Sequence, residues 1–154
     1  SWVVPSGVNS DHPGSGQFGT KNVDTGPAWV ASIVDAVGQS QDWNSTAIFI
    51  TWDDWGGWYD HVPPQQIDQN GLGFRVPLIV VSPFARTGYV SHTQHEFGSI
   101  LRFTEEQFNL PSLGTRDSVS DDLSDCFNFG HMRPFEPIAH GDYAHFDTSP
   151  PDSD

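Results

Sequence analysis

The first periodic segment of the chain predicts a helix. Apolar residues recur there at the spacing of one helical face: Val30, Ile33, Val34 and Val37. Thr25 suits the N-cap, Pro27 suits the first turn, and Gly38 suits the position after the helix end. We therefore expect a helix over residues 27–37. The Gly-, Ser-, Asn- and Asp-rich stretch over residues 1–25 predicts mostly loop.

Two short apolar runs then predict buried strands. Residues 47–51 read AIFIT and residues 75–81 read RVPLIVV, and both runs are rich in β-branched residues. The second run stops at Ser82 and Pro83, and the segment between the runs carries glycines and prolines that predict a loop. Because nearly continuous apolar runs are typical of strands covered on both faces, we expect the two strands to be parallel.

A second helix is predicted over residues 95–108. One helical face there carries Phe97, Ile100, Leu101, Thr104 and Phe108. Gly98 weakens this helix slightly. Beyond Pro111 the chain is polar, with a short helix expected near residues 118–126. From residue 131 it is rich in His, Pro and Asp, which predicts an extended tail.

This order of helix, strand, loop, strand and helix is typical of an α/β fold. We expect the helix over residues 27–37 to pack on a sheet that contains both strands. A chain of 154 residues is long enough for one domain with a core of its own. Functional sites in α/β sheets gather at the carboxyl ends of strands, so chemistry is expected directly after residues 47–51.

Composition and charge exclude some classes of function. The aromatic content of 13% compensates for a hydrophobic share of only 36%, so we expect a folded chain. The formal net charge of −14 repels nucleic acid and tolerates bound cations, although a solvated acidic surface explains it equally well. With Cys126 as the only cysteine, an internal disulfide and a zinc site built from two or more cysteines are excluded.

The ends of the chain point to a fragment or a processed product. It starts with SWVVPSG, carries no signal peptide, and its only methionine is Met132. No apolar run approaches the ~20 residues that a transmembrane helix needs, so no transmembrane segment is expected.

Two adjacent carboxylates, Asp53 and Asp54, follow the first predicted strand. Like charges repel, and burial near a sheet edge adds a desolvation cost, which a divalent cation offsets. Oxygen ligands suit Mg²⁺, Ca²⁺ or Mn²⁺ and can also serve Zn²⁺ or Fe. Gly56 and Gly57 then let the backbone turn sharply. The alternative is a solvent-facing acidic turn, since Asp is a common turn residue.

The string AIFITWDDWGGWYDHVPP over residues 47–64 resembles the signature of the phosphoesterase family that contains bacterial phospholipases C and acid phosphatases. SDHP at residues 10–13 resembles a histidine motif of that family, and residues 26–43 resemble the helix before the signature strand. Residues 73–111 resemble the following strand, its SPFA loop and the next helix. Together the similarity covers residues 1–130.

The resemblance implies an alkaline-phosphatase-like sandwich with a mostly parallel sheet flanked by helices. Residues 1–130 would be the carboxy-terminal part of the catalytic domain, and residues 131–154 an extended, acidic, Pro/His-rich tail. Asp53 and Asp54 would bind one or more divalent metal ions, and His12 would donate to a phosphoryl oxygen or protonate the leaving alcohol. The implied reaction is hydrolysis of a phosphate-ester or phospholipid substrate, in a secreted or periplasmic location.

The chain also departs from the family pattern. It contains neither the Glu-Asn metal-ligand motif nor the Ser or Thr nucleophile of the family's amino-terminal part. We therefore expect the missing amino-terminal half to be a required partner, and the chain alone to turn over little substrate. Position 54 is Asp where many members have Glu. The alternative function is a non-catalytic fragment, an acidic binding or assembly module that retains the fold.

The remaining histidines have two interpretations each. His61 faces the site or caps its loop by bonding backbone carbonyls. His95 aligns with a family histidine at a helix start, or it is a capping or surface residue near His92. The histidines of the tail bind metal loosely or are solvated: His131, His140 and His145.

Aromatic and basic residues near the signature are further candidates. Three tryptophans line a substrate cleft or fill the core: Trp52, Trp55 and Trp58. Arg75 and Arg86 are candidate phosphate ligands. Arg102 has a second interpretation, as an ion-pair partner of Glu105 and Glu106.

Overall fold

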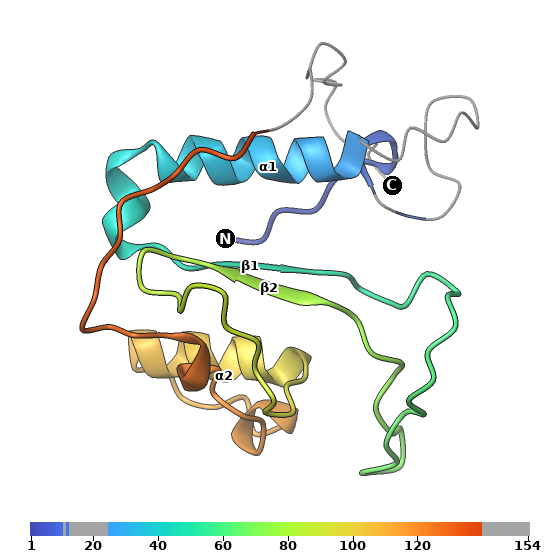
Figure 1. Ribbon diagram of the computed structural model, residues 1–154. Helices are drawn as coiled ribbons and strands as arrows, with labels where there is room; N and C mark the ends of the chain where they lie inside the picture. Colours follow the sequence, from blue (N-terminus) through green and yellow to red (C-terminus); the bar gives the residue numbers. More distant parts are fainter. Residues whose placement is uncertain (11, 13–24, 140–154) are drawn as a thin grey trace. The chain divides into compact units, whose positions relative to one another are not determined.

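The structure is a computed structural model that describes residues 1–10, 12 and 25–139 (Figure 1). It is a mixed α/β structure. The described residues divide into two compact units. The first contains residues from the ranges 1–43, 52–76 and 135–154, and the second contains residues 44–51 and 77–134.

The first unit contains α1 (Thr25–Gly38), which confirms the helix predicted over residues 27–37. Its buried face includes Val34, which is 1% exposed, and the carboxylate of Asp35, which accepts the N–H of Ile138 at 2.9 Å. Trp43, in the following 3-10 helix η3 (Gln41–Ser45), meets the ring of Phe135 edge to face at 5.0 Å. These contacts hold part of the predicted tail against α1. The domain boundary near residue 130 stays a prediction.

The second unit contains a sheet of two strands, β1 (Ile48–Thr51) and β2 (Leu78–Val81). The strands are antiparallel, with Ile48 opposite Val81 and Thr51 opposite Leu78. The prediction of parallel strands is therefore wrong.

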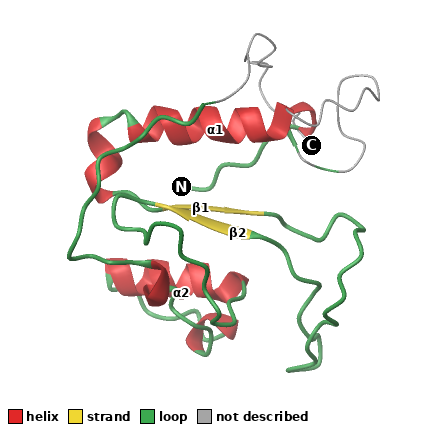
Figure 2. Cartoon of the chain, in the orientation of Figure 1, coloured by secondary structure: helices red, strands yellow, loops and turns green. Residues whose placement is uncertain are grey.

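The physical reason lies in the connection and in the burial of the strands. The chain between β1 and β2 returns as a long loop without the crossover helix that parallel strands usually need (Figure 2). Ile79 of β2 is also 48% exposed, whereas the strands of parallel sheets are usually buried on both faces. The larger sandwich with its mostly parallel sheet, and the packing of α1 on a sheet, stay predictions.

The core of the second unit lies between the sheet and α2 (Phe97–Phe108), which confirms the second predicted helix. Phe103 stacks on Phe127 at 4.9 Å and meets Phe49 of β1 edge to face at 5.1 Å. Ile100 and Leu123 complete the buried cluster. Among the residues that the structure describes, no helix combines the length and apolar character that crossing a membrane requires.

The ends of α2 are fixed by local hydrogen bonds. Glu96 is the N-cap, and it forms a capping box with Ser99. Arg116 donates to the Glu96 carboxylate through both Nε and a terminal nitrogen. The single short helix predicted near residues 118–126 is replaced by two 3-10 turns, η4 (Arg116–Ser118) and η5 (Ser124–Cys126).

Candidate functional site

The acidic loop begins directly after β1. The side chains of Asp53 and Asp54 are both exposed. Asp54 Oδ1 accepts the N–H of Gly56 at 2.6 Å, and Gly56 and Gly57 take positive φ angles of 63° and 77° to make the turn. The interpretation of the acidic pair as part of a turn is thus correct for Asp54 Oδ1. Metal binding by the pair stays a prediction.

A third carboxylate in this loop has a different environment. Asp60 receives two hydrogen bonds from the Arg75 guanidinium, at 2.8 and 2.7 Å, and one from the Val62 N–H at 3.0 Å. The Arg75 hydrogen bonds, followed by that of Val62, lower the pKa of the Asp60 carboxyl well below its usual range. Arg75 is therefore bound to Asp60. In the candidate role of Arg75 as a phosphate ligand, Asp60 would compete with the phosphate group for its guanidinium.

The predicted histidines of the first unit lie on its surface. His61 has a side chain that is 78% exposed, with Nδ1 3.8 Å from Asp60 Oδ1. His12 is exposed, and its backbone N–H donates to Ser10 Oγ at 3.1 Å. The predicted roles of both imidazoles at a phosphoryl group stay predictions.

His92 and His131 are exposed, while His140 and His145 lie outside the described residues. Arg86 Nε donates to the Phe127 carbonyl at 3.1 Å. The ion-pair interpretation of Arg102 is confirmed, since its Nε donates to Glu106 Oε1 at 3.0 Å.

Two of the three signature tryptophans are not core residues. Trp55 is 42% exposed and Trp58 is 72% exposed, whereas Trp52 is half-buried. Trp55 packs on the ring of Phe74 at 5.1 Å, so the two ends of the long loop meet through aromatic contact.

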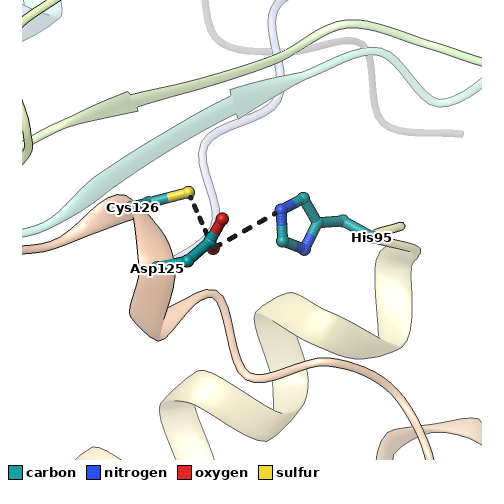
Figure 3. A group of neighbouring side chains, drawn as sticks. All are labelled: His95, Asp125 and Cys126. Carbon is teal, nitrogen blue, oxygen red and sulfur yellow. Dashed lines mark hydrogen bonds and ion pairs between the residues drawn. The ribbon is translucent and has the colours of Figure 1, made fainter. Parts of the chain in front are cut away.

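His95 lies in a polar cluster of the second unit (Figure 3). It immediately precedes the α2 N-cap, and its side chain is 15% exposed. Its Nδ1 lies 2.9 Å from Asp121 Oδ1, and its Nε2 lies 2.9 Å from Ser91 Oγ and 3.7 Å from Asp125 Oδ1. The surface or capping interpretation of His95 is therefore wrong, because the imidazole is largely buried between two carboxylates.

The side chains around Asp125 complete this cluster. Asp125 Oδ2 accepts hydrogen bonds from the hydroxyls of Ser91, Tyr89 and Thr93, at 2.6, 3.0 and 3.3 Å. Burial opposes ionisation of Asp125, yet hydrogen bonds from the Ser91 and Tyr89 hydroxyls and the Cys126 thiol lower its pKa overall. Desolvation and the neighbouring Asp125 charge raise the pKa of the Cys126 thiol to about 11.

Sequence reasoning did not identify this cluster. Ser91, Asp121 and Asp125 are ordinary residues of polar segments, and Cys126 was relevant only to disulfides and multi-cysteine zinc sites. Because the cluster joins the loop before α2 to the η5 turn, no local spacing could have pointed to it. An open hollow beside α2, lined in part by Glu105, Asn109 and Asp117, contains none of these residues.

Comparison with known proteins agrees with the signature. The profile of the Phosphoesterase family matches residues 1–111. The chain is 29% identical over 163 residues to the non-hemolytic phospholipase C of Burkholderia pseudomallei, covering 84% of this chain and 22% of that protein. It is 29% identical over 160 residues to phospholipase C B of Mycobacterium tuberculosis, with coverages of 84% and 29%.

A plant relative gives the same result. Identity to the non-specific phospholipase C4 of Arabidopsis thaliana is 32% over 141 residues, covering 75% of this chain and 25% of that protein. The chain thus spans between 22% and 29% of the length of these three relatives. With most of its residues matched by the family profile, the chain belongs to the Phosphoesterase family.

Proposed function

We propose that the chain carries the acidic, metal-binding part of a metal-dependent phosphoesterase that acts on phosphate esters or phospholipids, of the phospholipase C or acid phosphatase type. The observation that carries this proposal is the position of Asp53 and Asp54, which follow β1 directly and are exposed. The family match and the relatives named phospholipase C support the same chemistry. A secreted or periplasmic location, implied by the resemblance, belongs to the same proposal.

The donor set of the pair fits a divalent cation. Asp60 is neutralised by Arg75, but among the described residues neither Asp53 nor Asp54 forms an ion pair. Asp54 uses Oδ1 to hold the turn, which leaves Oδ2 for a ligand. Carboxylate oxygens suit Ca²⁺, Mg²⁺ or Mn²⁺ and can serve Zn²⁺ or Fe.

Each residue has a proposed role. Asp53 and Asp54 hold the ion, which when bound supplies Lewis acidity and neutralises charge on the phosphoryl oxygens. His12 donates a proton to a phosphoryl oxygen or to the leaving alcohol. His61 and His95 are weaker candidates, because His61 is mostly exposed and His95 is already held by Asp121 and Ser91.

In this proposal, the nucleophile lies in a part of the protein outside this chain. Thr51 carries the hydroxyl nearest in sequence to the acidic pair, and its Oγ1 donates to the Pro77 carbonyl at 2.9 Å. That hydrogen bond leaves it poorly prepared to attack phosphorus. The relatives are several times longer than this chain, which leaves room for the Glu-Asn ligands and the nucleophile.

Metal retention tests the role of the pair. Binding of Mn²⁺ should be lost in the Asp53→Asn, Asp54→Asn double variant, because both oxygen ligands are gone. Asp68→Asn is the matched control, since Asp68 is an exposed loop carboxylate whose Oδ1 only accepts the N–H groups of Asn70 and Gly71. Elemental analysis after dialysis measures the outcome. Equal metal content in the double variant and the control would refute the assignment.

Hydrolysis separates the enzyme from the alternative, a non-catalytic binding or assembly module. The chain alone should hydrolyse p-nitrophenyl phosphate or phosphatidylcholine at background, and adding the amino-terminal half should restore metal-dependent turnover. If the reconstituted protein binds metal at the pair but never turns over, the binding module is correct. A metal-dependent rate from the chain alone, lost in Asp53→Ala, would place the nucleophile within it, and Thr51 or a serine in residues 1–25 would be tested first.

A further inference from the structure

The proton count around His95 leaves one ring nitrogen of a neutral imidazole without a proper partner. The Ser91 hydroxyl has a single proton and donates it to Asp125 Oδ2 at 2.6 Å. A neutral imidazole protonated at Nδ1 then turns its Nε2 lone pair toward the Ser91 oxygen, 2.9 Å away. Protonated at Nε2 instead, it turns the Nδ1 lone pair toward Asp121 Oδ1 at 2.9 Å. Either neutral tautomer opposes two lone pairs, and the conflict is removed by a second proton on the ring or by a metal cation bound at one nitrogen.

The burial of this ring makes the conflict costly. Nδ1 is fully buried and, despite its closeness to Asp121, makes no hydrogen bond of good geometry. A buried nitrogen without a hydrogen bond is destabilising. If a cation binds Nε2 and a small rotation of the imidazole ring points Nδ1–H at Asp121, both ring nitrogens have a partner. A carboxylate that accepts the second N–H of a metal-bound histidine is a recurring arrangement in proteins.

Two further ligand atoms face Nε2. Because three hydroxyls hold Asp125 Oδ2, its other oxygen, Oδ1, points toward His95 and Cys126, at 3.7 Å from Nε2 and 3.5 Å from Sγ. The ligand atoms of His95, Asp125 and Cys126 all lie within 4.8 Å of one another. Metal–ligand bonds of about 2.0–2.3 Å in a tetrahedron separate neighbouring ligands by roughly 3.3–3.8 Å. The two measured separations fall in this range.

We propose that His95, Asp125 and Cys126 form a zinc site, with Asp121 orienting the imidazole. A nitrogen, an oxygen and a sulfur ligand together suit Zn²⁺ better than the hard cations expected at Asp53 and Asp54. On binding, the Cys126 S–H bond breaks, sulfur keeps the electron pair and bonds to zinc, and the proton passes to solvent. The site ties the loop before α2 to η5, and it does not depend on the function proposed above.

Cys126 provides a specific readout because it is the only cysteine of the chain. The experiment uses the chain with Asp53→Asn and Asp54→Asn, so that the acidic loop does not contribute. Calorimetric titration with Zn²⁺ in two buffers of different ionisation enthalpy should show about one proton released per ion. Zn²⁺ should protect Cys126 from iodoacetamide, and Co²⁺ should produce a thiolate-to-metal charge-transfer band.

Matched variants assign the ligands. Affinity should fall at least about tenfold in Asp121→Asn, which removes the orienting carboxylate, and further in His95→Gln and Cys126→Ser. His92→Gln is the control, because His92 is exposed and lies only three residues from His95. Equal Zn²⁺ affinity in His95→Gln and His92→Gln would overturn the proposal. If His95→Gln does not fold, an unchanged rate of Cys126 alkylation with and without Zn²⁺ would overturn it equally well.

Discussion

Asp60 and Asp53 carry the same side chain in the same loop, but their surroundings give them different roles. Asp60 is only 12% exposed at its side chain and is bound by the Arg75 guanidinium through two hydrogen bonds. Asp53 is exposed and forms no ion pair among the described residues. A carboxylate with a fixed cationic partner serves structure, whereas one without a partner is suited to a ligand.

The Asp60–Arg75 pair should make stability depend on pH. The folded-state pKa of Asp60 is lowered, mainly by Arg75, so its contribution is fully present above the unfolded value of about 3.9. It is lost as the pH falls from there through the folded pKa. Arg75→Met should therefore lower Tm at pH 7, by a small amount because Arg75 is largely exposed, and the difference from wild type should shrink in acid.

A double-mutant cycle isolates this pair. Thermal unfolding of the single and double variants of Asp60→Asn and Arg75→Met, followed by circular dichroism, gives the coupling at each pH. In the Asp60→Asn background, Arg75→Met should no longer change the pH dependence. A constant difference in Tm between Arg75→Met and wild type across the acid range would contradict the assignment.

At the scale of elements, α2 shows where helix propensity gives the wrong expectation. Gly98 weakens a helix, yet a Cβ built there would clash with Ser120 Oγ and lie 3.2 Å from backbone atoms of Arg116 and Asp117. The helix and the 116–120 turn approach so closely that only glycine fits between them. The Ser120 side chain is buried and donates to the Arg116 carbonyl at 2.6 Å, so it cannot move away easily.

Gly98→Ala should therefore destabilise the protein. Propensity alone favours alanine by about 1 kcal/mol, but overpacking costs about 1–3 kcal/mol. We expect a net loss of about 1 kcal/mol, measured by urea unfolding. Gly73→Ala is the matched control, since nothing lies within 4 Å of a Cβ built at that position. It should change stability by less than about 0.5 kcal/mol. A more stable Gly98→Ala variant would show that the turn moves aside.

At the scale of the whole molecule, exposed apolar side chains favour self-association, whereas the net negative charge disfavours it. Trp58 is 72% exposed, Tyr59 is 91% exposed and Phe108 is 72% exposed. Burial of such exposed side chains against other apolar surface is favourable. The net charge of −14 keeps copies of the chain apart.

Self-association should therefore rise with salt, because salt screens the repulsion and leaves apolar burial intact. Sedimentation velocity at low and high ionic strength should show a larger mean mass at high salt. Trp58→Ser with Tyr59→Ser should reduce the effect, whereas Trp58→Phe, which keeps an apolar ring, should retain most of it. A monomer at every ionic strength would contradict the expectation.

The sequence by itself determined both helices, the acidic pair after a strand and the family. Each of these depends on neighbouring residues: a period of 3.6 residues, two adjacent carboxylates, and a continuous signature. Only the tertiary structure decided that β1 and β2 are antiparallel, that Arg75 binds Asp60, and that His95 meets Asp125 and Cys126. These contacts join residues far apart in the chain. Which polar groups meet is settled only when the core closes and each buried donor and acceptor must find a partner.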